Sequence, residues 1–385
     1  MFDFSLYQKV KVVYGPGSSS KIGELVREAN YSNAFVVFDE GIKASGIIDK
    51  ILQSLKGSGV IYTCYDKVMP NPADDMIEEA SLICNREKCD VVIGVGGGSS
   101  IDAAKGINIL RFNEAPMLRY ADFINVEMKV SPGLISIPTT AGTGSELSDG
   151  LIVTDHKSGD KIPVLAVNGM SEYAVIDPEL MIGMPLGLTV MTGLDALCHA
   201  CESYITIRSN QMKDQIAEKA IELVYQWLPL ALEDGKNIEA RSHMAIAASM
   251  GGWMLREANA LAGHSFGHVL GAKYHIPHGA ACTYAEPYIL EYNADVVPEK
   301  IKKIGMGLGV KFTGKESSEE IGALTKDAFI SFYQRLGLKP IKEYNCDLST
   351  LPEVANLIKD EPFMYFNMKQ MEYDEIMTIL NKIYA

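Results

Sequence analysis

The sequence predicts an α/β domain with a mostly parallel sheet, followed by an all-helical domain. In the first half, short β-branched runs alternate with helix-length segments, which is typical of βαβ units. After Pro185 the strand patterns nearly vanish, and long amphipathic helical periods replace them. The length of 385 residues suits two or three domains. We therefore expect residues 1–184 and 185–385 to form two domains.

The individual elements follow from local patterns. Strands of the sheet are expected at 11–14, 34–38, 60–62, 90–95 and 133–137. Two further strand patterns, 151–154 and 162–165, are separated by a polar turn and predict a hairpin. After the hairpin, residues 174–176 are expected to return to the sheet. Ser18, Ser19 and Ser20 are expected to cap the first helix. In the second half, helices are expected at 215–232, 241–261 and 371–383.

Composition excludes several kinds of partner. The chain carries 35 Lys and Arg against 49 Asp and Glu, a net charge of −14, so nucleic acid and anionic membranes are not expected to bind. It has no apolar run of the ~18 residues that a membrane span needs, and its first residues lack the pattern of a secretory signal. Seven cysteines, an odd number, favour a reducing compartment, so we expect a cytoplasmic protein.

A glycine-rich loop follows the strand at 90–95 and opens a helix. Gly96, Gly97 and Gly98 allow a phosphate to approach the backbone, and the N–H groups at the helix start favour an anion. Ser99 or Ser100 is expected to cap this helix. The alternative is an ordinary tight turn. A second loop of small residues, 136–146, follows another strand, and the two together favour a nucleotide site at the carboxyl edge of the sheet.

The loop is not a Rossmann fingerprint, which places an acidic residue ~20 residues after the glycines. Instead, Asp39 ends a strand well before the loop. A carboxylate there can bind a ribose 2′-OH and repel a 2′-phosphate. The alternative is a solvated strand end.

Histidines gather in the second half. Asp195 and His199 are four residues apart and share one face of a helix, and His264 and His268 have the same spacing. One Asp with several His residues suits a divalent first-row metal, Zn(II) or Fe(II). The spacing leaves open which of four histidines bind: His264, His268, His275 and His278. The CxxC pair Cys198 and Cys201 is interpreted as buried small side chains, not as a redox or zinc motif.

Several motifs in order resemble the iron-containing, group III alcohol dehydrogenases, the family of lactaldehyde reductase, 1,3-propanediol dehydrogenase and butanol dehydrogenases. The resemblance runs from about residue 5 to the C-terminus. It rests on PNP (70–72), GGGSSIDAAK, SIPTTAGTGSE, AVIDP, MTGLDALCHACESY, AGHSFGHVLG and HIPHG. It implies an NAD-binding domain followed by a helical metal-binding and catalytic domain, the architecture of dehydroquinate synthase.

The resemblance also implies roles for particular residues. The positions that match the family's metal ligands are Asp195, His199, His264 and His278. His268 matches a nearby histidine that is not a ligand, and it is the candidate catalytic residue. Asp39 matches the residue associated with preference for NAD. The remaining candidate coenzyme contacts are Asn71, Gly96, Gly97, Gly98, Ser99, Asp102, Thr139, Thr140, Thr143, Lys161 and Leu180. The hairpin that carries Lys161 departs from the usual family sequence.

The expected activity is NAD(H)-dependent, metal-dependent interconversion of a small aldehyde and its primary alcohol, of the kind used in fermentation. Fe(II) is the expected metal and Zn(II) the alternative. A homo-oligomer, a dimer or larger, is expected. Three alternatives remain: a reductase of an acidic aldehyde such as sulfoacetaldehyde or succinate semialdehyde, a non-redox lyase of the dehydroquinate synthase type, and a non-catalytic metal-binding or scaffold subunit.

Overall fold

The computed structural model describes residues 4, 6–121 and 126–385. The chain divides into two compact units, one spanning Tyr7–Ile182 and the other built mainly from Gly183–Ala385. The first unit is α/β and the second is helical, which confirms the predicted fold class. None of the helices in the described part of the chain has the length and hydropathy of a membrane span.

The α/β unit contains a six-stranded sheet in which every pair of neighbouring strands is parallel. Its order is β1-β8-β5-β4-β2-β3. The central strands β2, β4 and β5 are almost wholly apolar because both faces are covered by helices. The strands are β1 Lys11–Tyr14, β2 Asn33–Asp39, β3 Ile61–Val68, β4 Val91–Gly96, β5 Leu134–Pro138 and β8 Tyr173–Ile176.

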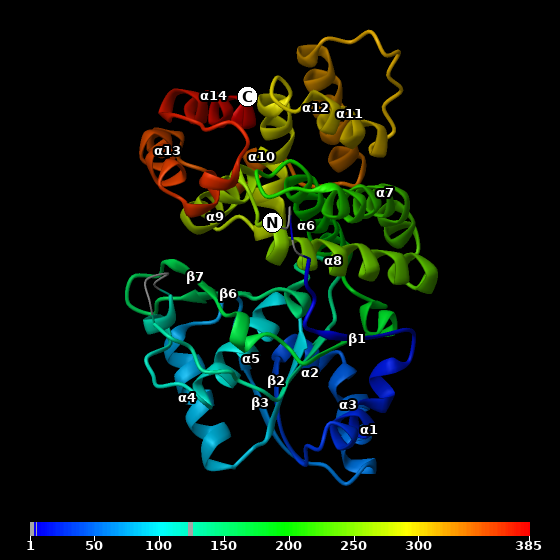
Figure 1. Cartoon of the computed structure of the whole chain (residues 1–385), viewed down its shortest axis with the longest axis vertical. Helices are drawn as coiled ribbons and strands as arrows, with labels where there is room; N and C mark the ends of the chain where they lie inside the picture. The colour runs from blue at the N-terminus through cyan, green and yellow to red at the C-terminus, as the bar shows by residue number, and fades with distance from the viewer. Residues whose placement is uncertain (1–3, 5, 122–125) are drawn as a thin grey trace. The chain divides into compact units, whose positions relative to one another are not determined.

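Helices lie on both faces of the sheet (Figure 1). Ile22 of α1 and Ile51 of α3 pack on one face, and Ile77 of α4 and Ile107 of α5 pack on the other. The α-helices of this unit are α1 Ile22–Glu28, α2 Glu40–Ala44, α3 Ile47–Gly57, α4 Asp74–Arg86 and α5 Gly98–Leu110. The 3-10 helices are η1 Ser18–Lys21, η2 Met117–Tyr120, η3 Ser145–Leu147, η4 Val167–Gly169 and η5 Pro178–Met181.

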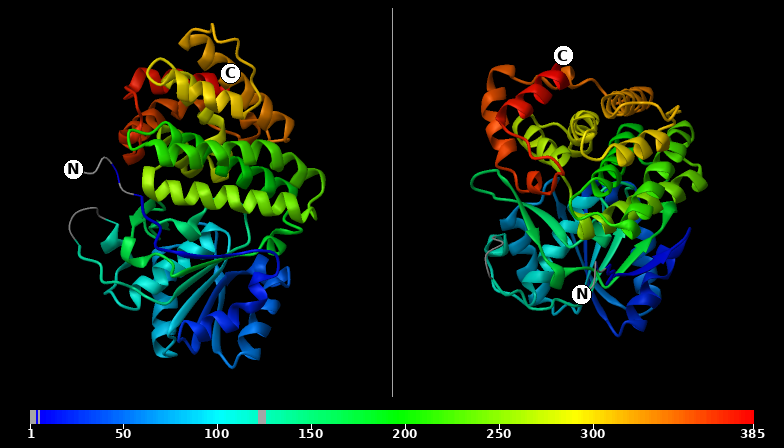
Figure 2. Two further views of the ribbon diagram at one scale, coloured as in Figure 1. Left: turned by 45° about the vertical axis from the view of Figure 1, so that its right-hand side comes forward. Right: turned by 45° about the horizontal axis from the view of Figure 1, so that its top comes forward.

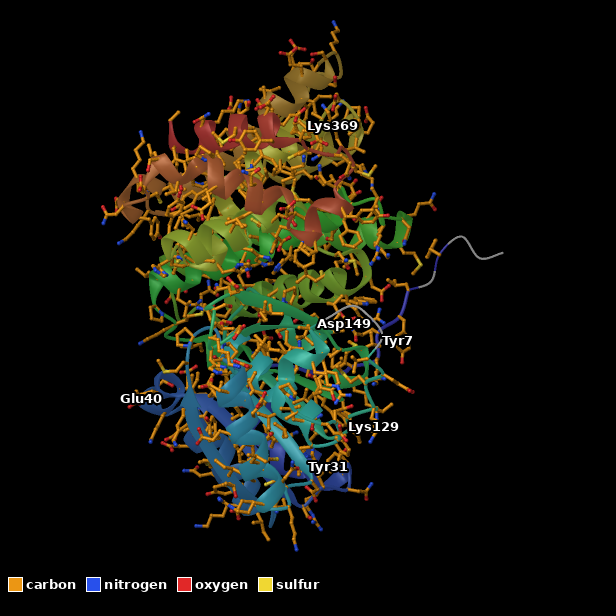
Figure 3. All side chains as sticks on the ribbon, turned by 90° about the vertical axis from the view of Figure 1, so that its left-hand side faces the viewer. Tyr7, Tyr31, Glu40, Lys129, Asp149 and Lys369 are labelled. Carbon is orange, nitrogen blue, oxygen red and sulfur yellow. The ribbon has the colours of Figure 1, made fainter. Side chains whose placement is uncertain are left out.

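The strand order reverses between β2 and β4, which are neighbours. The chain leaves β2 through α2 and α3 on one face and leaves β4 through α5 on the other. Such a reversal opens a crevice at the carboxyl ends of the two strands, where α/β proteins bind ligands. Asp39 ends β2 and Gly96 ends β4, so these two of the predicted coenzyme-binding residues lie at this point. Tyr31 and Glu40, labelled in Figure 3, flank β2 at its two ends.

The predicted hairpin is present. β6 Gly150–Thr154 and β7 Lys161–Leu165 pair antiparallel and form a separate two-stranded sheet. Leu151, Val153 and Val164 point into the same apolar core as α4 and α5. The hairpin is therefore packed on the α/β unit by its apolar face.

The predicted serine caps are wrong. The helices at Ile22 and Gly98 have no side-chain cap among the described residues. The serine hydroxyls bind other partners: Ser19 Oγ donates to Asp177, and Ser100 Oγ donates to Asp39. Ser19 and Ser100 therefore make tertiary hydrogen bonds in place of the predicted helix caps, while Ser20 Oγ donates to the backbone carbonyl of Gly17.

The regular elements described in the second unit are all helices. α6, α7 and α8 pack against one another, and α10 packs against α6, α9 and α12. Figure 2 shows α7 and α8 running side by side. The α-helices are α6 Leu186–Tyr204, α7 Gln211–Glu233, α8 Ile238–Ala258, α9 Ala262–Tyr274, α10 His278–Asn293, α11 Pro298–Gly307, α12 Ser318–Arg335, α13 Leu351–Lys359 and α14 Tyr373–Tyr384. The 3-10 helices are η6 Ile341–Tyr344, η7 Leu348–Thr350 and η8 Pro362–Phe366.

Candidate metal and coenzyme sites

Helix α6 supplies one side of the candidate metal site, which is the cluster of Asp195, His199, His264 and His278. The helix is apolar around most of its circumference, which is typical of a buried helix, and residues 193–204 are all buried. Asp195, His199 and Glu202 are polar exceptions, and their spacing of four and three residues places them along one face. All three side chains are buried.

Helix α9 begins against Glu202. The first N–H groups of a helix have no partner within the helix and need acceptors from elsewhere. Glu202 Oε2 accepts from Leu261 N–H, and Oε1 accepts from His264 N–H at 2.9 Å. A carboxylate from α6 therefore anchors the start of α9 and brings His264 to the face that carries Asp195. His264 Nδ1 lies 2.9 Å from Glu202 Oε2, which directs its Nε2 away from that carboxylate.

His278 enters from a third helix. Pro277 precedes α10 and ends the short loop that follows α9. His275, in that loop, has φ 54° and ends α9 in the left-handed conformation. The loop therefore turns the chain so that the first residue of α10 joins the cluster, while His275 remains part of the turn.

The cluster converges on one oxygen. Asp195 Oδ1 lies 3.9 Å from His199 Nε2, 4.0 Å from His264 Nε2 and 3.6 Å from His278 Nε2. Ligand atoms around a tetrahedral metal stand about 3.4 Å apart when each bond is about 2.1 Å. Neither Asp195 Oδ1 nor His264 Nε2 has a hydrogen-bond partner among the described residues, although both are buried. Buried polar atoms without partners are costly, so the donor set fits a divalent cation.

Cys282 forms a second, overlapping group. Candidate ligand atoms of Asp195, His264, His278 and Cys282 all lie within 4.8 Å of one another. Burial raises the pKa of the Cys282 thiol to about 11, and burial raises the pKa of Asp195 to about 6. The Cys282 thiol is therefore a further candidate donor beside the oxygen and imidazole donors of this cluster.

Two buried carboxyl groups lie behind His264. Glu202 and Glu286 flank Gly263, where a Cβ atom would overlap an oxygen of each. Neither oxygen of Glu286 has a hydrogen-bond partner among the described residues. Burial and the neighbouring charge of Glu202 hold the pKa of Glu286 well above its usual range. Burial beside Glu202 therefore favours the neutral form of Glu286.

His268 is one helical turn beyond His264. Its ring stacks on His278, with centroids 5.4 Å apart, and meets His264 edge-on. Its Nδ1 lies 2.6 Å from Oε1 of Glu361, which precedes η8. Hydrogen bonds from His268, Phe363 N–H and Ser265 offset the effect of burial and lower the pKa of Glu361. The predicted catalytic histidine is thus held beside the cluster by a carboxylate.

The glycine loop and the threonine loop lie against each other at the end of the sheet. A Cβ atom on Gly98 would lie 2.9 Å from Thr143 Cγ2, and one on Gly97 would lie 3.4 Å from Thr140 Cγ2. Gly96 has φ 147°, and its Cβ would lie 2.5 Å from Ser100 Oγ. A side chain at Gly96 or Gly98 would displace these neighbours, whereas a Cβ atom on Gly97 would make an ordinary contact. The N–H groups at the start of α5 lie in this loop, and a helix N-terminus favours an anion.

Asp39 borders the same loop. Its Oδ1 accepts from Ile42 N–H at 2.9 Å and caps α2, and its Oδ2 accepts from Ser100 Oγ at 3.2 Å. The carboxylate is only partly buried. Asp39 therefore serves as a helix cap and also places a negative charge beside the glycine loop.

The other candidate coenzyme residues are distributed over several elements of the α/β unit. Asn71 has φ 55°, and its N–H donates to Ser99 Oγ. Thr139 follows β5 and donates its N–H to Gly96 O. Lys161 begins β7, and Leu180 is buried in the apolar core of the sheet.

Asp102 and Lys105 form a buried polar network beneath the two loops. Asp102 accepts from Ser145 Oγ at 2.6 Å and from Ile152 N–H at 3.0 Å. Lys105 is 1% exposed and donates to Ser145 Oγ and to Gly150 O, at 2.8 and 2.6 Å. The network ties α5 to the segment that leads from the threonine loop into the hairpin.

Sequence reasoning missed Glu202, Glu286, Glu361, Cys282 and Lys105. Two of these had a local signal: Glu202 is one of two acidic residues in a mostly apolar helix, and Lys105 lies one turn after Asp102. Glu361 had no such signal, because 93 residues separate it from His268.

Comparison with known proteins identifies the class. Residues 9–178 match the family model "Iron-containing alcohol dehydrogenase", and residues 189–384 match "Fe-containing alcohol dehydrogenase family, C-terminal". The chain belongs to the iron-containing alcohol dehydrogenase family, whose members are oxidoreductases that act on alcohols.

Individual relatives are similar over most of their length. 1,3-Propanediol dehydrogenase of Klebsiella pneumoniae is 32% identical over 391 residues, covering 100% of this chain and 99% of the relative. NAD-dependent methanol dehydrogenase of Bacillus methanolicus is 32% identical, covering 78% of this chain and 79% of the relative. A solved 1,3-propanediol oxidoreductase superposes with a TM-score of 0.94 at 31% identity and full coverage of both chains.

Proposed function

We propose that this protein is an NAD(H)-dependent alcohol dehydrogenase that interconverts a small aldehyde and its primary alcohol with the help of a divalent metal. The observation that carries the proposal is the position of Asp195 Oδ1 within 4.0 Å of three imidazole Nε2 atoms. Family membership and the relative named as NAD-dependent support the choice of reaction and coenzyme.

The proposed metal ligands are Asp195, His199, His264 and His278. A divalent metal held there supplies Lewis-acid polarisation of the substrate oxygen. Fe(II) is the first choice, in line with the family description, and Zn(II) is the second, since both suit imidazole and carboxylate donors. The Asp195 carboxylate contributes the single negative charge of this ligand set.

The α/β unit is proposed to bind the coenzyme, with the glycine and threonine loops around its phosphates and Asp39 near its ribose. The nicotinamide supplies or accepts the hydride. His268 is proposed to relay the hydroxyl proton or to orient the substrate. The motifs that carry the proposed metal ligands contain no Lys or Arg, and Arg256, on the helix before His264, pairs with Glu257, so we propose an uncharged aldehyde as substrate.

The test is an aldehyde panel assayed after separate reconstitution with Fe(II) and Zn(II). Propanal, butanal, lactaldehyde, 3-hydroxypropanal and one acidic aldehyde are each mixed with NADH or NADPH. We expect aldehyde-dependent consumption of NADH in a one-to-one ratio with an uncharged aldehyde. If no aldehyde consumes NADH with either metal, the proposal is wrong, and tight NAD binding without net redox would indicate a lyase.

Coenzyme choice is expected to depend on Asp39. Replacing Asp39 by asparagine removes the charge that repels a 2′-phosphate, and asparagine remains a good helix cap for α2. We expect the preference for NADH over NADPH, as a ratio of kcat/KM values, to fall by about 10–100-fold. The matched control is Glu40→Gln, which removes an exposed charge at the next residue and is expected to leave the ratio unchanged. An unaltered ratio in Asp39→Asn, or an NADPH preference in the unmodified chain, contradicts this role.

We further propose that the protein works as a homo-oligomer in the cytoplasm. All seven cysteines are free thiols, which accords with a reducing compartment.

A further inference from the structure

The carboxylate of Glu361 is held in one orientation by two donors that are independent of the histidine. Ser265 Oγ and Phe363 N–H both donate to its Oε2, each at 2.9 Å. The other oxygen, Oε1, is left to face His268 Nδ1 at 2.6 Å. The orientation of Glu361 is therefore set by contacts other than its contact with the imidazole. Glu361 is also remote from α9 in the sequence.

This arrangement selects one form of the imidazole. A carboxylate accepts hydrogen bonds, so His268 Nδ1 must carry the proton and donate it. In the neutral ring the other nitrogen, Nε2, is then an acceptor, because the partner of one nitrogen determines the role of the other. The stacking of His268 on His278 holds the ring beside the candidate metal site.

We propose that Glu361 is a positioning residue for the reaction, which orients His268 and keeps Nε2 ready to accept a hydrogen bond from the substrate hydroxyl. This inference rests on the proposed function, since it concerns how His268 serves that reaction. It assigns Glu361 no contact with the reacting atoms.

The sharpest variant is Glu361→Gln. Phe363 N–H can only donate, so the amide oxygen must remain on that side and the NH₂ group must face His268 Nδ1. The imidazole then has to accept at Nδ1 and carry its proton on Nε2, the opposite tautomer. The side chain keeps its size, and the bonds that hold it to Ser265 and Phe363 are retained.

We expect Glu361→Gln to lower kcat for oxidation of the alcohol by NAD, the direction in which Nε2 accepts from the substrate hydroxyl, by about 100-fold, the lower end of what a proton-transfer group contributes. KM for the alcohol and the metal content, measured by elemental analysis, are expected to stay within about threefold of the unmodified protein. Ser265→Ala is the matched control: it removes one bond to Glu361 but leaves the Glu361–His268 pair, so we expect a much smaller loss of kcat.

The decisive measurement is a double-mutant cycle with His268→Ala. If Glu361 acts through His268, adding Glu361→Gln to His268→Ala causes no further loss of kcat. An equal loss in both backgrounds, or an unchanged kcat in Glu361→Gln, overturns the inference. These outcomes are read only from a parent protein that reduces aldehydes with NADH, so a parent without that activity contradicts the proposed function instead.

Discussion

Replacing Asp195 by asparagine is expected to weaken binding of Fe(II) or Zn(II) by more than about 100-fold. Removing a residue that merely supports a ligand costs 10–100-fold in metal affinity, so neutralising the one carboxylate in the ligand set should cost more. Asp195 Oδ1 is the atom on which three imidazole nitrogens converge, and the amide oxygen that replaces it is neutral.

The same substitution is not expected to unfold the helical unit. Asp195 is buried, and burial raises its pKa to about 6, so its charge is costly when no cation is bound. Asparagine has the same size and no charge. We therefore expect the free energy of unfolding of the metal-free variant to equal or exceed that of the metal-free parent.

Metal affinity is measured by competition with a chromophoric chelator, under anaerobic conditions for Fe(II). Asp214→Asn is the control, because it makes the same change in the same unit at a residue that pairs with Lys300. The control should bind metal as the parent does. Retention of affinity within threefold in Asp195→Asn would remove this residue from the ligand set.

Replacing Lys105 by methionine is expected to lower the free energy of unfolding of the α/β unit by about 3 kcal/mol or more. Methionine fills a similar volume but cannot donate. Ser145 Oγ, Ser148 Oγ and Gly150 O lose the cation that bonds them, and the buried Asp102 carboxylate loses its nearby positive charge. The KM for NADH should rise as well, because the loop leading into the hairpin is no longer tied to α5.

Amide hydrogen exchange in α5, monitored at increasing urea concentrations, measures the stability of this unit separately from that of the helical unit. Lys50→Met is the control: Lys50 is exposed on α3, and we expect a change within about 0.5 kcal/mol. Equal stabilities for Lys105→Met and Lys50→Met would show that the buried network adds nothing to the fold.

The sheet could be predicted because its strands are short, β-branched and bounded by turns. β1, β4 and β5 begin and end within a residue of the predicted ranges, whereas β3 continues to Val68, well beyond 60–62. The extra residues of β3 include Asp66 and Lys67, which are polar because this edge strand has one neighbour, β2. A partly exposed strand at a sheet edge, with polar residues in its sequence, gives a weaker signal than a buried one.

The candidate metal site could be predicted only in part. Spacing along one helix identifies residues that share a face, as with Asp195 and His199. It does not reveal how α6, α9 and α10 pack, and that packing decides whether His278 or His275 reaches Asp195. For the same reason, the contact between Glu361 and His268 could be identified only from the structure.

The pair of carboxyl groups around Gly263 bears on how this protein can evolve. α9 approaches α6 and α10 so closely that even a methyl group at position 263 would collide with both Glu202 and Glu286. A side chain at position 263 would require the carboxyl groups of both Glu202 and Glu286 to move or to be shortened. The choice of residue at these three positions, which lie far apart in the sequence, is therefore coupled through the contact between their helices.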